Sequence, residues 1–117
     1  MADLHDEIER EIADNTILVY GKGTKDAPRC GFTLETIQFF NAFGYPFEVV
    51  DVLENMPKRQ ALSELTDWNT LPKVFIDGQF YGDTDILGPM AQNGELQNVL
   101  KETFGSEPQA KTTINLR

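Results

Sequence analysis

The sequence predicts an α/β domain in which helices flank a mixed β-sheet. Short runs of apolar and β-branched residues, such as 16–20, alternate along the chain with stretches of helical periodicity. Two such runs joined by a helix favour a parallel pair of strands. Asp77-Gly78 lies between two later runs and is typical of a tight hairpin turn, which adds antiparallel strands to the sheet. A sheet of this kind is expected to lie between layers of helices.

The first helix is indicated by Leu4, Ile8 and Ile12, which recur every four residues among charged side chains and form one apolar face. Asp14-Asn15 ends this helix. The run that follows, 16–20, is almost continuously apolar, which is typical of a strand buried on both faces.

The remaining elements follow from the same periodicities and from glycine and proline at their ends. A helix that begins at Gly31 is expected to end at a Gly44 C-cap, and the helix over 58–65 is expected to bury Leu62 and Leu65. Gly88-Pro89 should interrupt and kink the helix over 85–92, because proline lacks a backbone donor. The other expected elements are strands at 46–52, 71–76 and 79–81 and a helix at 95–104.

We expect one domain over 1–104, since a chain of this length can bury an ordinary hydrophobic core. Residues 105–117 show neither helical nor strand periodicity. They are expected to form a flexible C-terminal tail.

The composition argues against several classes of function. Ten Lys and Arg against 19 Asp and Glu give a net charge of −9, and nucleic-acid binding requires a clustered basic face. No apolar run approaches the roughly 18 residues of a membrane-spanning helix. The acidic first residues lack the basic and apolar segments of a secretory signal, so we expect a cytoplasmic protein.

Cys30 is the only cysteine, so an intramolecular disulfide is excluded. One Cys and one His also cannot supply the four ligands of a structural zinc site. A lone cysteine is by default a small buried hydrophobic residue. Its alternative role is that of a reactive thiol, and its neighbours in the sequence decide between the two.

The position of Cys30 favours a reactive thiol. It lies where a loop over 21–29, containing glycine and proline, joins the first buried strand to the next helix. Ligands of open α/β sheets bind beyond the carboxyl ends of the strands, and free N–H groups at a helix N-terminus stabilise a thiolate. Lys22 and Arg29 add positive charge nearby in an otherwise acidic chain.

Several segments resemble the monothiol glutaredoxins. Lys22-Gly23-Thr24 and Pro28-Arg29-Cys30-Gly31-Phe32-Thr33 are similar to that family's Lys-Gly-Thr and Pro-Arg-Cys-Gly-Phe-Ser. Trp68-Asn69-Thr70-Leu71-Pro72 is similar to Trp-Pro-Thr-x-Pro, Gly82-Asp83-Thr84-Asp85-Ile86 to Gly-Gly-Cys-Asp-Ile, and Asn93-Gly94-Glu95-Leu96 matches a further stretch. The likeness runs over 4–104 in the family's order. It implies a thioredoxin-like fold with a four-stranded mixed sheet and an extra N-terminal helix.

The resemblance also implies a glutathione-binding role for charged residues. Lys22 and Arg59 would contact the glycyl carboxylate of glutathione, and the alternative for both is a solvated surface cation. Asp85, with the backbone around Thr84, would hold the γ-glutamyl amine and carboxylate. Asp85 could equally be an acidic residue in the first turn of a helix, without a ligand.

The uncharged contacts implied by the resemblance centre on Cys30 and on the segment around Pro72. Pro72 would be a cis-proline, and the Leu71 backbone would pair with the cysteinyl part of glutathione as a strand edge pairs with an extended peptide. Thr70 would shape this edge. Phe32 would form an apolar wall of the site, with core packing as its alternative.

The chain departs from the family pattern at several positions. Thr33 replaces Ser and adds a methyl group, and Asn69 replaces Pro. Asp83 replaces the second Gly and brings a negative charge close to the expected γ-glutamyl site, where it could weaken glutathione binding or alter the loop. Thr84 stands where many members carry a second cysteine, so a disulfide to Cys30 is excluded.

Two hypotheses use the same thiol. In the first, Cys30 and glutathione hold a [2Fe–2S] cluster between two copies of the chain, and the protein serves iron–sulfur transfer, assembly and iron homeostasis. The family adds acceptor proteins and a BolA-like protein as partners. In the second, the protein is a glutathione-dependent oxidoreductase that removes glutathione from proteins through one thiol. A third alternative is a degenerate binding module in which Asp83 impairs glutathione capture.

Overall fold

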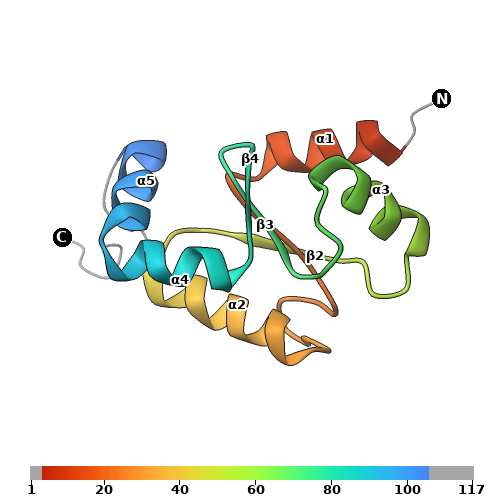
Figure 1. Ribbon diagram of the computed structural model, residues 1–117, viewed down its shortest axis with the longest axis horizontal. Coiled ribbons are helices and arrows are strands. Elements are labelled where there is room, and N and C mark those ends of the chain that lie inside the picture. Colours follow the sequence, from red (N-terminus) through yellow and green to blue (C-terminus); the bar gives the residue numbers. More distant parts are fainter. Residues whose placement is uncertain (1–3, 106–117) are drawn as a thin grey trace.

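The computed structural model describes residues 4–105, so the tail expected at 105–117 lies outside the described residues except for Gly105. Within them the elements follow the predicted order (Figure 1). They are α1 (Leu4–Asp14), β1 (Ile17–Gly21), α2 (Gly31–Phe43), β2 (Glu48–Asp51), α3 (Met56–Thr66), β3 (Lys73–Ile76), β4 (Gln79–Gly82), α4 (Thr84–Gln92) and α5 (Glu95–Phe104).

The described strands form one mixed sheet, as the sequence predicts, and their order in the sheet is β2-β1-β3-β4. β1 and β2 are parallel, with Val19 opposite Val49, and β3 is antiparallel to both β1 and β4. Asp77 and Gly78 both have positive φ, 51° and 81°, as the predicted tight hairpin turn between β3 and β4 requires.

Two hydrophobic clusters pack against the two faces of the sheet. Along β1, Ile17 and Val19 point into one cluster while Leu18 and Tyr20 point into the other, which is the alternation expected of a strand. The first cluster includes Phe40, Leu87, Leu96 and Leu100 from α2, α4 and α5, and the second includes Ile8, Ala61 and Leu62 from α1 and α3. Figure 1 shows α1 and α3 above the sheet and α2 and α4 below it.

Two expectations about the helices are wrong. Leu65 is 47% exposed rather than buried, because the buried stripe of α3 runs through Lys58, Ala61 and Leu62 and ends before the last turn. α4 is not interrupted at Gly88-Pro89 and continues to Gln92. Pro89 lacks the N–H that would donate to the Asp85 carbonyl, and the helix nevertheless continues past it for another turn. The predicted Gly44 C-cap of α2 is confirmed, with a φ of 83°.

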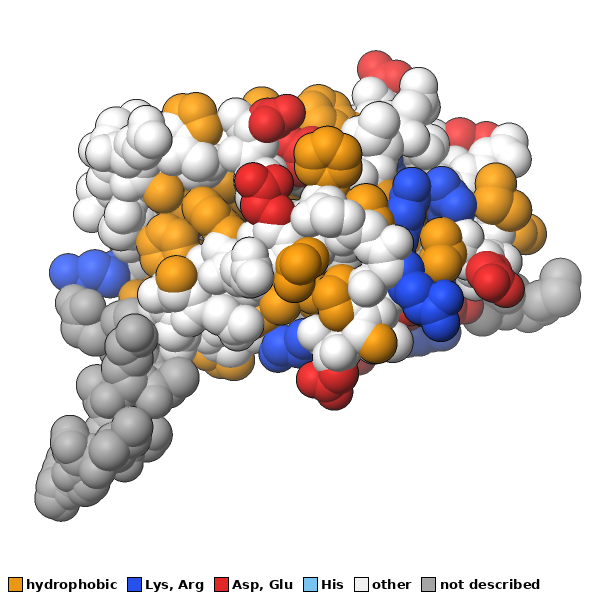
Figure 2. Space-filling view, turned by 90° about the horizontal axis from the view of Figure 1, so that it is seen from below, with side chains coloured by type: hydrophobic (Ala, Val, Ile, Leu, Met, Phe, Trp, Pro, Cys, Tyr) orange, Lys and Arg blue, Asp and Glu red, His pale blue; other side chains and the backbone are white. Residues whose placement is uncertain are grey.

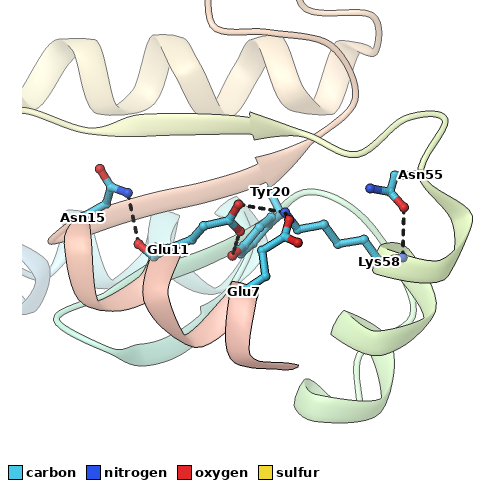
Figure 3. Close-up of polar contacts among 6 residues, drawn as sticks. All are labelled: Glu7, Glu11, Asn15, Tyr20, Asn55 and Lys58. Carbon is cyan, nitrogen blue, oxygen red and sulfur yellow. Dashed lines mark hydrogen bonds and ion pairs between the residues drawn. The ribbon is translucent and has the colours of Figure 1, made fainter. Parts of the chain in front are cut away.

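A buried lysine joins α1 to α3. Lys58 is 4% exposed, and its Nζ lies 2.7 Å from carboxylate oxygens of both Glu7 and Glu11. The hydroxyl of Tyr20 donates to Glu11 at 2.7 Å, so the group also reaches β1 (Figure 3). The hydrogen bond from the Lys58 ammonium lowers the pKa of Glu7. This group holds α3, whose first turns carry Arg59, against α1.

We expect Lys58→Met to lower the free energy of unfolding by about 1–3 kcal/mol, the range for a lost hydrogen bond to a charged group. Because the pKa of Glu7 is lowered in the folded state, its stabilising contribution is present above 4.5 and is lost as the pH falls below that value. The difference between wild type and variant should therefore shrink in acid. Urea unfolding of both proteins at several pH values measures this difference.

Candidate functional site

The predicted site residues lie on segments that meet at one end of the sheet. β1 and β2 end side by side, since Gly21 pairs with Asp51. β3 begins at that same end, because Lys73 pairs with Tyr20, and β4 ends there, because Gly82 pairs with Val74. The loop to Cys30, the start of α3, the segment before β3 and the start of α4 therefore all leave the sheet at this end. We call it the strand-end site.

Cys30 is the N-cap residue of α2, in an extended conformation with φ −154° and ψ 139°. Its thiol is partly buried. The pKa of Cys30 is lowered, chiefly by hydrogen bonding from the Thr33 N–H, although partial burial acts in the opposite direction. The Phe32 N–H, the charge of Lys22 and the Thr33 hydroxyl lower it further. A lowered pKa increases the fraction of thiolate, the form that attacks disulfides and binds metal. The prediction of a helix-start thiol is confirmed.

Thr33 connects the first turn of α2 to the end of β1. The side chain is fully buried, and its hydroxyl accepts a hydrogen bond from the Lys22 N–H at 3.0 Å. A Cβ on Gly21 would lie 2.8 Å from the Thr33 methyl carbon, closer than packed atoms allow. Thr33 therefore fills a space that glycine at 21 leaves open, and the methyl group that departs from the family pattern is accommodated.

The loop between β1 and Cys30 is a small hairpin held by its own backbone. Arg29 donates its N–H to the carbonyl of Lys22 at 2.8 Å, and Gly23 bridges to Pro28. Gly23 has a φ of 92°, and a Cβ there would meet the backbone of Ala27 and Arg29 at 2.5 Å, so only glycine fits. This hairpin fixes the position of Lys22 relative to the helix start.

Asp51 ties this loop to the segment after β2. One of its carboxylate oxygens accepts from the N–H groups of Leu53 and Gly23, each at 2.9 Å. These two hydrogen bonds and the charge of Arg29 lower the pKa of Asp51. Arg29 and Asp51 also line a cleft of about 280 Å³ together with Leu53, Glu54 and Asn55.

Arg59 lies in the first turns of α3, beside the same segment. Its Nη1 donates to the carbonyl of Leu53 at 3.0 Å and contacts the sulfur of Met56 at 3.6 Å. The Leu53 N–H in turn donates to Asp51, which holds Gly23. Lys22 lies in the loop after β1 and Arg59 in the first turns of α3, and Asp51 connects the two segments through Gly23 and Leu53.

The segment before β3 contains the predicted cis-proline, since the Leu71-Pro72 peptide bond is cis. The register that pairs Lys73 with Tyr20 places Pro72 next to Gly21 and hence close to the loop that carries Cys30. Lys73 is 1% exposed, and its ammonium donates to the carbonyls of Trp68 and Thr70. Burial lowers the pKa of Lys73 to about 8. This lysine holds the backbone immediately before the cis bond.

Thr84 and Asp85 form the first turn of α4. The Thr84 hydroxyl donates to Glu35 on α2 at 3.3 Å, which brings the start of α4 close to the helix of Cys30. The side chain of Asp85 is exposed, and its N–H donates to a carboxylate oxygen of Asp83 at 2.9 Å. Asp83 is therefore the N-cap of α4.

Two of the segments that form the strand-end site carry exposed apolar side chains. Phe32, next to Cys30 in the sequence, is 68% exposed, so its alternative of core packing is ruled out. Met56 is 61% exposed at the start of α3. In the view from below, Lys and Arg side chains gather toward the right with hydrophobic side chains between them (Figure 2). Trp68, in contrast, packs edge-on against Phe80 at 5.8 Å, as expected of a structural residue.

Neither a metal-binding cluster nor a membrane-spanning helix is found within residues 4–105. No group of three or more His, Cys, Asp or Glu in this range could hold a metal ion. No helix in the same range is long and apolar enough to cross a membrane.

The chain was compared with known proteins. The family model described as Glutaredoxin matches residues 17–81. A Synechocystis protein named as an uncharacterized monothiol glutaredoxin, ycf64-like, is 40% identical over 99 residues, which are 85% of this chain and 92% of that protein. Glutaredoxin 4 of Escherichia coli is 41% identical over 103 residues, 88% of this chain and 90% of its own length.

Solved structures show the same fold. Reduced apo GrxS14 from poplar superposes with a TM-score of 0.77 at 36% identity, covering 88% of this chain and 94% of its own. A buckwheat glutaredoxin in complex with glutathione gives a TM-score of 0.78 at 21% identity, covering 88% and 92%. At that identity the likeness is one of fold alone.

The mixed sheet, the flanking helices and the thiol at the start of α2 define a thioredoxin-like protein with a single cysteine. With relatives of about 40% identity over most of its length, the chain belongs to the monothiol glutaredoxin family.

Two residues of the site have no role in the sequence-based interpretation. Asp51 joins two loops through one carboxylate, and nothing in its sequence context distinguishes it from other acidic residues. Lys73 gives a clearer signal, because it is a charged residue inside an otherwise apolar strand, Lys73-Val74-Phe75-Ile76. A charge in such a strand requires polar partners inside the fold.

We expect Thr33→Val to raise the pKa of Cys30 and to slow its alkylation at neutral pH by about two- to fivefold, the scale of one weak hydrogen bond. The variant keeps the shape of the side chain but loses the hydroxyl that faces the thiolate and accepts from Lys22. Thr33→Ser keeps the hydroxyl and is the matched control. The ultraviolet absorbance of the thiolate against pH measures the pKa of Cys30 in both variants. Equal titration of the Val and Ser variants would contradict this role.

Proposed function

We propose that this protein binds glutathione at the strand-end site and, as a pair of chains, holds a [2Fe–2S] cluster that it delivers to acceptor proteins in iron–sulfur assembly and iron homeostasis. The observation that carries the proposal is the accessible thiol of Cys30, the only one in the chain, at a helix start that lowers its pKa. Membership in the monothiol glutaredoxins supports it. We place the protein in the cytoplasm, where reducing conditions preserve a free thiol.

The distribution of charge supports glutathione as the ligand. Glutathione carries two carboxylates, one ammonium and a thiol in an extended tripeptide. No hydrogen bond or ion pair engages the Lys22 ammonium within residues 4–105, and Arg59 uses one of its nitrogens on Leu53. A guanidinium has five N–H donors, so Arg59 keeps donors for a carboxylate of the ligand. We assign these two cations to the glycyl end.

The other parts of glutathione find matching groups along the site. Its cysteinyl backbone pairs with Leu71, whose backbone precedes the cis-proline. Thr70 shapes that edge, and Phe32 covers the ligand with an apolar ring. The γ-glutamyl ammonium lies against Asp85, with the Thr84 backbone beside it. The sulfur of glutathione then lies at Cys30.

The number of thiolates explains why a second chain is required. A [2Fe–2S] cluster takes four ligands, and each chain supplies one cysteine. Within residues 4–105 no cluster of three or more His, Cys, Asp or Glu could hold a metal ion by itself. Two chains and two glutathiones together supply the four thiolates, with Cys30 at the contact between protomers. A BolA-like protein in place of one protomer is the heteromeric form that the family implies.

Anaerobic reconstitution with iron, sulfide and glutathione tests this proposal. We expect a brown dimer whose visible absorbance requires glutathione and whose mass contains two chains, one cluster and two glutathiones. Cys30→Ser should abolish the colour, while Thr33→Ser, which keeps the buried hydroxyl, should retain it. A colourless monomer under these conditions would contradict the proposal.

The lowered pKa of Cys30 favours a second candidate, thiol–disulfide exchange. The Cys30 thiolate attacks the glutathione sulfur of a protein–glutathione disulfide, and the protein leaves as a thiolate. A glutathione thiolate then attacks the mixed disulfide on Cys30 and releases oxidised glutathione. Rapid turnover of a glutathionylated peptide by a colourless monomer would favour this activity over cluster transfer.

A further inference from the structure

Gly82 and Asp83 are neighbours with different backbone conformations. Gly82 has a φ of 83°, and a Cβ there would lie 3.1 Å from Ile86 and 3.4 Å from the ring of Trp68. Asp83 has an extended backbone, with φ −140° and ψ −164°, which any residue adopts. The backbone therefore requires glycine at 82 and accepts a side chain at 83.

The side chain of Asp83 engages a donor at the start of α4. Its Oδ1 accepts from the Asp85 N–H at 2.9 Å, and its carbonyl accepts from Ile86 and Leu87 at 3.0 Å. The N–H groups of the first turn have no partners inside a helix, so they are the donors that an anion at this end can use. In this chain one of them is already satisfied by the chain's own carboxylate.

A second carboxylate lies close by. Glu35 on α2 accepts from the Thr84 hydroxyl at 3.3 Å. Asp83, Glu35 and the exposed Asp85 place negative charge around the start of α4, which attracts an ammonium and repels a carboxylate. The γ-glutamyl end of glutathione carries one of each on the same carbon, so these residues act in opposite directions on its two groups.

We propose that Asp83 is a specificity-determining residue: its carboxylate competes with the γ-glutamyl carboxylate of glutathione for the Asp85 N–H, and so weakens glutathione binding relative to a chain with glycine at 83. This inference rests on the proposed function, which places the γ-glutamyl group at Thr84 and Asp85. Glutathione binding then requires the Asp83 side chain to give up its hydrogen bond to the Asp85 N–H. Binding also brings the Asp83 carboxylate close to the γ-glutamyl carboxylate.

Titration calorimetry with reduced glutathione tests the competition. We expect Asp83→Gly to bind about tenfold more tightly than wild type, the scale of one recovered hydrogen bond to a charged group. Asp83→Asn removes the charge but keeps an oxygen that can accept from Asp85, so its affinity should lie between the two. Asp77→Gly changes the net charge equally in the hairpin turn at the opposite end of β3 and should leave the affinity unchanged.

Stability does not confound the comparison. Glycine is an accepted N-cap residue and costs little stability there, and Asp83→Asn retains the cap. Thermal unfolding followed by circular dichroism checks that each variant is folded before it is titrated.

A second ligand isolates the group involved. Glutathione whose γ-glutamyl carboxylate is converted to an amide lacks the competing anion. Asp83→Gly should improve binding of this amide much less than it improves binding of glutathione itself. An equal gain for both ligands would show that Asp83 acts on another part of the ligand and would overturn the inference.

The remaining outcomes separate the inference from the proposed function. Equal glutathione affinity in wild type and Asp83→Gly overturns the inference alone. Weaker binding by Asp83→Gly also overturns it, because that result would mean that Asp83 holds the ligand ammonium. Absence of glutathione binding in all variants contradicts the proposed function, and the inference with it.

Discussion

The buried contact between Thr33 and the end of β1 is the constraint on which the functional arrangement depends. The Thr33 hydroxyl accepts from Lys22, and its methyl group fills the space beside Gly21. The N-terminus of α2 is thereby fixed against the last residues of the strand. Cys30 receives its stabilising N–H groups only because this helix begins at that point, one residue beyond the thiol. A shift of the helix start would remove the hydrogen bonds that lower the pKa of the thiol.

The charged groups of the site are separated, with cations on one side and carboxylates on the other. This separation suits a ligand whose two ends carry different charged groups. Lys22 lies in the loop after β1 and Arg59 in the first turns of α3, and Asp51 holds the loops after β1 and β2 together. Carboxylates stand at the opposite side, at the start of α4. The backbone before Pro72 lies between them and is held by the buried Lys73. Each part of the strand-end site is held in place by a buried or hydrogen-bonded group of the chain itself.

Sequence patterns predict the element order, the hairpin turn, the helix-start thiol and the cis-proline, because each depends on local chemistry or on a family motif. They fail for Leu65 because helical periodicity does not show where a packed surface ends. They also miss Lys58, a buried cation that takes a place in the apolar stripe of α3 and pairs with carboxylates far away in the sequence. The role of Asp83 as an N-cap is visible only in the structure, since a capping carboxylate and a ligand-binding one look the same in the sequence.

The central claim is that the strand-end site, formed by segments far apart in the sequence, is a single glutathione-binding surface. Mapping amide chemical shifts during titration with reduced glutathione tests it most directly. The largest changes should fall around Lys22, Cys30, Leu71 and Asp85. Largest changes at the opposite end of β1, in the cleft lined by Asn15, Pro46 and Phe104, would contradict it.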